Sequence, residues 1–234
     1  MQRIDVALIR SKVREQGLWK VIRRIVAELG RLVYHQRSCY IFRDDLDRPF
    51  PLNPVLLFEQ LAGFEFRWLD LARGEDRGVM ADMMGRAEFG YTPEDLQQRL
   101  DRHDRCYVAL DEGKAATYVW QGVGEREIYT GQRMWPGAGE CFLYDGYTFK
   151  EYRGRRLLPG IMCRARKDLA AEGFRRILAD IACDNTSSIR AVEAAGFYRH
   201  ARITGHIFFG LLRCYRWKIL AETGEPSVPP GAGK

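Results

Sequence analysis

The stretch that decides the fold spans residues 143–197. It opens with Leu143-Tyr-Asp-Gly-Tyr-Thr-Phe149 and continues with Tyr152-Arg-Gly-Arg-Arg-Leu-Leu-Pro-Gly160. The first run has the pattern of a strand, and the second is a basic loop that leads into a helix predicted over 158–172. A helix amino terminus carries unpaired backbone N–H groups and a partial positive charge, so this loop is suited to bind a diphosphate.

The neighbouring residues strengthen that interpretation. Arg153, Arg155 and Arg156 would add charge-assisted contacts to phosphate oxygens. Gly173 ends the predicted helix, and an apolar strand follows over 176–182. A short helix over 187–195 comes next, introduced by Asn185-Thr-Ser-Ser188 and closed by Gly196-Phe197. The segment therefore alternates strand, helix, strand and helix.

This order and spacing resemble the GNAT superfamily of acetyl-CoA-dependent N-acetyltransferases. The residues that carry the resemblance are Tyr152-Arg153-Gly154, Gly173, Asn185 with Ser188, and Gly196-Phe197. The resemblance implies an α/β fold with a mixed, mostly antiparallel central sheet flanked by helices. It would extend over residues 38–219, with an extra amphipathic helix at the amino terminus.

The resemblance also implies an acetyl-CoA site. Main-chain groups of Tyr147, Thr148 and Phe149 would meet the pantetheine arm in the manner of an added strand. The phosphates would bind the loop formed by Arg153, Gly154, Arg155, Arg156, Leu157 and Leu158. Asn185 and Ser188 would hold the amide arm, although Asn185 could equally cap the following helix, as could Ser187 or Ser188.

The sequence departs from the family pattern at two places. Arg156 and Leu158 stand where the phosphate loop usually has small residues, which allow a close approach of the backbone. Val192 stands where many members have a tyrosine that protonates the departing thiolate. A thiol with a pKa near 8.5 leaves with little help, so this loss does not abolish transfer.

The amine acceptor must lose a proton, which calls for a general base. Alternation along the strand predicts Cys141, Leu143, Asp145 and Tyr147 on one face, so Asp145 is the first candidate. A structural role as a hydrogen-bonded strand residue competes with it. Glu140 and His206 are weaker candidates for the base. Tyr147, and also Tyr144, could supply a proton, although aromatic residues in strands usually serve packing.

Outside this segment the sequence predicts secondary structure only approximately. Strands are expected over 38–43, 198–208 and 211–219, with a hairpin over 106–120 and proline-rich sequence near 49–54. Thr92-Pro-Glu-Asp95 predicts a helix start, and helical pieces are expected around 68–73 and 76–86. The acceptor pocket is assigned to residues 55–90 and the final hairpin. Residues 220–234 form a predicted disordered tail.

The amino-terminal segment is basic. Residues 1–43 hold ten Lys or Arg against three Asp or Glu, whereas the whole chain has a net charge of +6. Apolar residues form one stripe of a helix over residues 18–33. The stripe could pack on the domain, form a dimer with a second subunit, or lie on a membrane surface with its arginines on anionic phosphates. Residues 1–37 are therefore predicted to be a separate extension.

Composition also limits the cellular location, the metal sites and the partners that the sequence predicts. The sequence contains no run of 18 apolar residues, which a membrane-spanning helix would need, and no apolar run typical of a secretory signal. A cytoplasmic location is therefore expected, with peripheral contact to the inner membrane face as an option. Six scattered cysteines are expected to be buried thiols, and no spacing with histidines predicts a metal site. Nucleic acid is disfavoured, because the basic helix lacks stacking residues between its charges.

The sequence thus predicts an enzyme that moves acetyl from acetyl-CoA to a primary amine of a small molecule. The acceptor class suggested is an amino sugar or an amino acid derivative. Two alternatives remain open: a non-catalytic binding or scaffold protein with the same fold, and a transferase that uses a longer acyl donor at a membrane.

Overall fold

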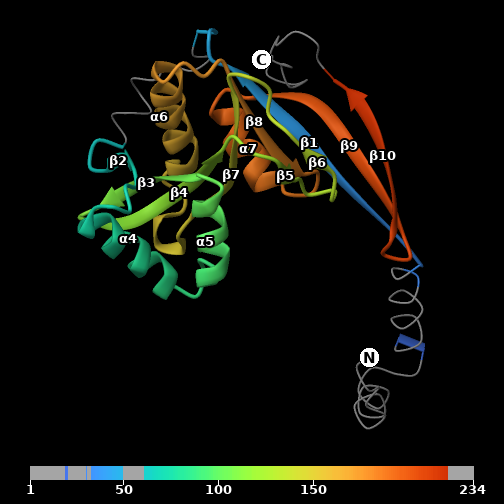
Figure 1. Cartoon of the computed structure of the whole chain (residues 1–234), viewed down its shortest axis with the longest axis horizontal. Helices are drawn as coiled ribbons and strands as arrows, with labels where there is room; N and C mark the ends of the chain where they lie inside the picture. Colours follow the sequence, from blue (N-terminus) through green and yellow to red (C-terminus); the bar gives the residue numbers. More distant parts are fainter. Residues whose placement is uncertain (1–18, 21–29, 31–32, 50–60, 221–234) are drawn as a thin grey trace, which may run out of the picture. The chain divides into compact units, whose positions relative to one another are not determined.

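The computed structural model describes residues 19–20, 30, 33–49 and 61–220 (Figure 1). These residues form β1 (Tyr34–Asp45), β2 (Glu65–Trp68), α4 (Gly74–Gly85), α5 (Pro93–Asp101), β3 (Arg105–Asp111), β4 (Lys114–Gly122), β5 (Arg126–Glu127), β6 (Arg133–Met134), β7 (Glu140–Thr148), the short 3-10 helix η1 (Lys150–Tyr152), α6 (Leu157–Ala171), β8 (Arg176–Ala182), α7 (Thr186–Ala194), β9 (Tyr198–Phe208) and β10 (Leu212–Ile219). Two compact units are distinguished: Met1–Arg37 with Thr204–Arg216, and Ser38–Ile203 with Trp217–Lys234.

The central sheet is mixed and mostly antiparallel, as predicted. Its eight strands run in the order β10-β9-β1-β8-β7-β4-β3-β2. β7 and β8 are parallel, whereas the pairs β1–β8, β2–β3, β3–β4 and β4–β7 are antiparallel. The first strand, β1, thus lies inside the sheet, between β8 and β9.

Hydrophobic clusters cover the two faces of the sheet. On one face, Val79 and Met83 of α4 pack with Val108, Tyr118 and other strand residues. On the opposite face, Ile161 and Ala165 of α6 pack with Ile189 of α7 and with strand residues such as Leu143. Helices therefore flank the sheet on both faces, and α6 and α4 occupy different faces.

Local sequence explains several of these elements. Thr92 accepts a hydrogen bond from the N–H of Asp95, whose carboxylate accepts from the N–H of Thr92, so the predicted helix start is a complete capping box. Glu112 and Gly113 both have positive φ, as a two-residue hairpin loop between β3 and β4 requires. One expectation is wrong: residues 68–73 are not helical, because Trp68 ends β2 and pairs with Tyr107.

The cysteines depart in part from expectation. Cys39, Cys106, Cys141 and Cys163 are buried, but Cys183 is half-buried and Cys214 is exposed. Cys214 is exposed because nearly all of β10 has both faces open to solvent. Among the described residues there is no cluster of potential metal ligands.

Several predictions fall wholly or mainly outside the described residues. These are the amphipathic helix over 18–33, the prolines at positions 51 and 54, and the tail. The boundaries proposed at residues 37 and 219 remain predictions, and so does a cytoplasmic location. None of the helices in the described part of the chain is long and apolar enough to cross a membrane.

A buried ion pair joins α6 to the end of β1. Nε of Arg166 donates to Oδ2 of Asp44 at 2.7 Å, and both side chains are less than one-tenth exposed. Burial raises the pKa of the Asp44 carboxyl to about 6, although Arg166 opposes that change. Burial also acts on Asp45, but hydrogen bonds from Arg43, Arg176 and Tyr198 outweigh it and lower the pKa of Asp45 to about 2.

Candidate functional site

The candidate site begins where β7 and β8 stop pairing. The two parallel strands are in register only at Glu140–Arg176, Cys141–Ile177 and Phe142–Leu178. β7 continues to Thr148 and β8 to Ala182. Within the described part of the chain, no other strand pairs with the edge of β7 that follows Phe142 on this side. The carboxyl ends of the two strands therefore carry main-chain groups that can bind a ligand.

A β-bulge interrupts β7 at the same place. Tyr118 of β4 pairs with Tyr147, but Trp120 pairs with Tyr144, so β7 contains one residue more than β4. Asp145, in the bulge, has φ of 47°, a conformation that costs energy for a residue other than glycine. A Cβ on Gly146 would lie 2.9 Å from Cδ1 of Leu158, so glycine permits α6 to start close to the bulge.

The bulge corrects one expectation from the sequence. Cys141 and Leu143 pack on the face covered by α6. Tyr147 instead packs with the cluster on the opposite face, and Asp145 is bonded to Arg99 of α5. The four residues predicted on one face are thus divided between both, because the extra residue reverses the alternation of side chains.

The predicted phosphate loop supplies free backbone donors. Gly154 and Arg156 have φ of +80° and +56°, and Arg156 precedes α6 without a side-chain cap. The N–H groups of residues 154–158 donate to no acceptor in the described part of the chain. Pro159 in the first turn has no N–H to add. Arg153, Arg155 and Arg156 are exposed, whereas the side chain of Leu157 is buried and only its N–H is available.

Arg153 and Tyr147 form a hydrogen-bonded chain beside this loop. Nε of Arg153 donates to the carbonyl of Thr148 at 3.2 Å, and its Nη2 donates to the hydroxyl of Tyr147 at 2.7 Å. That hydroxyl donates to Oε2 of Glu88 at 2.9 Å. Desolvation and the Glu88 bond raise the pKa of Tyr147, so the phenol stays protonated at neutral pH. Glu88 belongs to the segment assigned to the acceptor pocket.

Asn185 is seen in its capping role. Its Oδ1 accepts from the N–H of Ser188 at 3.2 Å and from the hydroxyl of Ser187 at 3.0 Å, at the start of α7. Val192 is buried in the cluster beneath α6. The structure therefore accounts for Asn185 and Val192 without a bound ligand.

Asp145 is held by a buried arginine that sequence reasoning missed. Nη2 of Arg99 donates to Oδ2 of Asp145 at 2.6 Å, and Tyr91 hydrogen-bonds to the same carboxylate. The guanidinium lies 4.3 Å from the ring centroid of Tyr91 and 4.9 Å from that of Trp120. Arg99 is 9% exposed, and its Nη1 has no partner among the described residues. The side chain of Asp145 remains 42% exposed, so its carboxylate can still contact a ligand.

A second carboxylate, Asp180 of β8, lies on the same face of the sheet. Its neighbours Leu178 and Ala182 pair with Arg43 and Cys39 of β1, and Leu178 packs in the cluster on that face. Oδ2 of Asp180 accepts from the N–H of Tyr129 at 2.8 Å. Burial raises the pKa of Asp180, Arg126 opposes that change, and the charge of Asp145 adds to it. The negative charge of Asp145 thus disfavours the charged form of Asp180.

Arg126 interacts with Asp180 and with the ring of Tyr144. Its guanidinium stands 3.3 Å from the ring centroid of Tyr144, and its Nε is buried without a partner in the described ranges. Asp180, Arg99 and Arg126 carried no motif in the sequence. The only available signal was an aspartate in the middle of an otherwise apolar strand.

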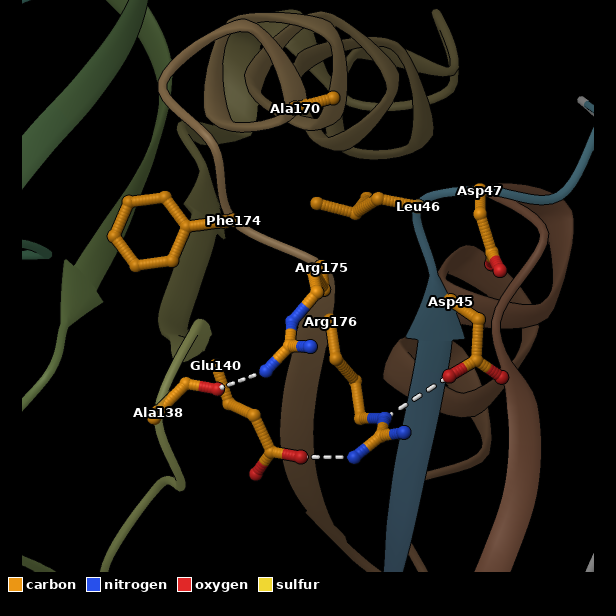
Figure 2. A pocket seen from close by; sticks show the side chains of 9 residues that line it. All are labelled: Asp45, Leu46, Asp47, Ala138, Glu140, Ala170, Phe174, Arg175 and Arg176. Carbon is orange, nitrogen blue, oxygen red and sulfur yellow. Dashed lines mark hydrogen bonds and ion pairs between the residues drawn. The ribbon is translucent and has the colours of Figure 1, made fainter.

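A cavity of about 450 Å³ lies at the amino ends of β7 and β8, opposite to the ends described above (Figure 2). Arg176 bridges Asp45 and Glu140 inside it, and Glu140 also accepts from the N–H of Gly137. Arg175 donates to the carbonyl of Ala138 at 3.0 Å. Glu140 is thus engaged in an ion pair away from Asp145, which removes it as a candidate base. His206 belongs to the other compact unit, where it hydrogen-bonds to Tyr34.

Comparison with solved structures identifies the fold. The chain is similar to a GCN5-related N-acetyltransferase from Sphaerobacter thermophilus, with a TM-score of 0.54 and 16% identity over 79% of this chain and 56% of that one. A tandem GNAT protein of the clavulanic acid biosynthesis pathway gives a TM-score of 0.49 at 18% identity, over 81% and 59% of the two chains. A GNAT acetyltransferase from Colwellia psychrerythraea gives 0.48 at 12% identity, over 80% and 57%.

The chain spans less than two thirds of the length of each of these proteins. No protein-family model matches it, and no curated protein sequence does. The likeness to the Sphaerobacter protein shows that the described part of the chain has the fold predicted from residues 143–197.

Proposed function

Starting from the GNAT fold of this chain, we propose that it is an N-acyltransferase that moves acetyl from acetyl-CoA to a primary amine of a small molecule. The observation that carries the proposal is the separation of β7 from β8. It leaves free loop amides on the side of α6 and two carboxylates on the opposite face of the sheet. A donor bound at the loop and an amine held at the carboxylates would meet in the gap between the strands.

The residues present fit a coenzyme of this kind. Free N–H groups over residues 154–158 and the exposed Arg155 and Arg156 suit a diphosphate, and the unpaired edge of β7 suits an extended amide arm. Arg153 would have to leave the carbonyl of Thr148, which it occupies in this structure. The coenzyme supplies the activated thioester, whose C–S bond is weak enough to be broken by an amine.

The chain's own groups then handle protons and orientation. Asp145, fixed by Arg99 and Tyr91, holds the amine of the acceptor near the gap after its ammonium form has released one proton to solvent. Asp180 takes the second proton, which the nitrogen loses as the new N–C bond forms, since burial raises the pKa of this carboxyl above its ordinary value. Tyr147, which stays protonated, returns a proton to the departing sulfur. Should Asp145 itself take the proton, as the strand pattern suggested, the two carboxylates would exchange roles.

The first test is coenzyme binding. Acetyl-CoA at about 100 times its Kd is expected to stabilise the chain by roughly 2.7 kcal/mol, which is a rise of about 5–10 °C in Tm for a domain of this size. The measurement is thermal unfolding with acetyl-CoA, free CoA and a longer acyl-CoA in parallel. A larger rise in Tm with the longer acyl-CoA would indicate that the donor carries an acyl chain longer than acetyl. No rise in Tm with any of the three compounds would favour a non-catalytic role.

A second prediction concerns the loop arginines. Arg155→Glu combined with Arg156→Glu is expected to weaken acetyl-CoA binding at least about tenfold, because charge-assisted bonds contribute about 1.5–3 kcal/mol each. Calorimetric titration measures the change. Arg77→Glu, an exposed charge reversal on α4, serves as the matched control and should bind normally. Equal affinities in all three proteins would place the phosphates elsewhere.

A further inference from the structure

A second surface, unrelated to acyl transfer, lies at the turn between β9 and β10 (Figure 1). We call Phe209–Leu212 the hairpin tip. Phe209 is 69% exposed, Leu211 is 88% exposed and Leu212 is 65% exposed. Single exposed apolar residues are ordinary, but three within four positions form a patch that solvent does not favour.

The backbone of the tip holds these side chains outward. Phe209 and Gly210 have φ of 52° and 70°, and the N–H of Leu211 donates to the carbonyl of Phe208 at 3.0 Å. A bulky aromatic residue with positive φ is strained. Packing within the described residues does not offset this strain at Phe209, because its ring is mostly exposed to water. The N–H of Phe209 donates to the carbonyl of Val33 at 2.9 Å, which fixes the tip beside the end of the amino-terminal segment in the same compact unit.

The two strands that flank the tip carry basic residues and no acidic ones. No Asp or Glu occurs from Tyr198 to Leu220, whereas Arg213, Arg216 and Lys218 follow the tip within β10. The other part of this unit, Met1–Arg37, contains nine Lys or Arg against three Asp or Glu. An exposed apolar tip that is followed by exposed basic residues on β10 is complementary to a layer of anionic headgroups above hydrocarbon.

We propose that the hairpin tip docks this chain on anionic lipid bilayers, with Phe209, Leu211 and Leu212 among the acyl chains and Arg213 and Arg216 at the phosphates. The same charges disfavour a second copy as the occupant. Two copies pairing along the exposed edge of β10 would bring like charges together, and basic residues on edge strands oppose such pairing. Aliphatic leucines at the tip likewise offer no stacking surface for nucleic-acid bases.

The test uses the full chain and sedimentation with two kinds of vesicle. Binding is expected to mixed phosphatidylcholine–phosphatidylglycerol vesicles and not to pure phosphatidylcholine. Leu211→Ser with Leu212→Ser should weaken it about tenfold or more, since each buried CH₂ adds to membrane affinity. Arg213→Glu with Arg216→Glu should weaken it at low salt and reduce its salt dependence. Trp135→Ser, an exposed apolar residue in the other unit, is the control and should bind as the wild type does.

Unchanged Tm and unchanged acetyl-CoA titration in solution would show that the tip variants are folded. Vesicle binding that survives Leu211→Ser with Leu212→Ser would overturn the proposal. Absence of vesicle binding, together with a dimer that these substitutions convert to a monomer, would assign the tip to a second copy instead. Binding of a short DNA duplex with no binding to vesicles would assign the basic surface to nucleic acid.

Discussion

Asp180→Asn is expected to lower kcat for amine acetylation about 100-fold, because a positioned general base contributes about 10²–10⁴ to the rate. Asparagine has nearly the same shape and keeps an oxygen to accept from the N–H of Tyr129, so the fold and the Kd for acetyl-CoA should not change. The assay uses the best acceptor from a panel of primary amines. The rate of the wild type should fall as Asp180 becomes protonated at low pH, and the variant should lose that acid limb.

Asp145→Asn is the companion variant. Because Arg99 and Tyr91 position this carboxylate to bind the acceptor, its removal is expected mainly to raise the KM for the amine and to lower kcat less. The pH profile separates the two carboxylates. If Asp145→Asn removes the acid limb while Asp180→Asn leaves it in place, Asp145 is the base and the roles proposed here are reversed.

Arg166→Leu is expected to lower the free energy of unfolding by about 3–5 kcal/mol at neutral pH, because Asp44 loses the partner of its buried charge and must either stay charged or take up a proton. Asp44 has a raised pKa of about 6 in the folded protein, against 3.8 as its ordinary value. Its protonation therefore favours the folded state at low pH, and that contribution is lost as pH rises through 6. Removing Arg166 raises this pKa further, so the penalty should shrink at about pH 5.

Urea unfolding at the two pH values measures this effect. Asp45, whose pKa is lowered to about 2, contributes stability above its ordinary pKa and loses it only as pH falls through 2, so it does not distort the comparison. Asp44→Asn added to Arg166→Leu should recover much of the loss at neutral pH. An equal loss at both pH values, unrelieved by the second substitution, would show that Arg166 acts through packing alone.

The sequence predicted those parts of the fold that depend on local signals. The capping box at Thr92, the turn at Gly113 and the basic loop before α6 each involve residues that are close in the chain, and their structures agree with expectation. The place of β1 inside the sheet could not be predicted in this way. It depends on pairing with β8, which lies far away in the sequence.

The candidate site was predicted less completely, for a physical reason. A bulge changes no residue type, so the alternating pattern from Cys141 to Tyr147 looks regular although one extra residue reverses it. Arg99 resembled any arginine on an exposed helix face, yet aromatic rings bury it. Asp180 lies in a segment that the sequence predicts to be a buried apolar strand. Its carboxylate gains a candidate role only because β8 no longer pairs with β7 at this position.

The position of β1 also bears on how the chain matures during translation. β1 emerges from the ribosome early, whereas β8 and β9, the strands on either side of it, are made near the end of the described chain. At about 5–20 residues per second, the interval before β8 is complete is on the order of ten seconds. Throughout that time Cys39, Ile41 and Phe42, all buried in the finished sheet, have no permanent neighbours. The nascent chain therefore keeps these apolar side chains exposed to solvent until β8 and β9 have been synthesised.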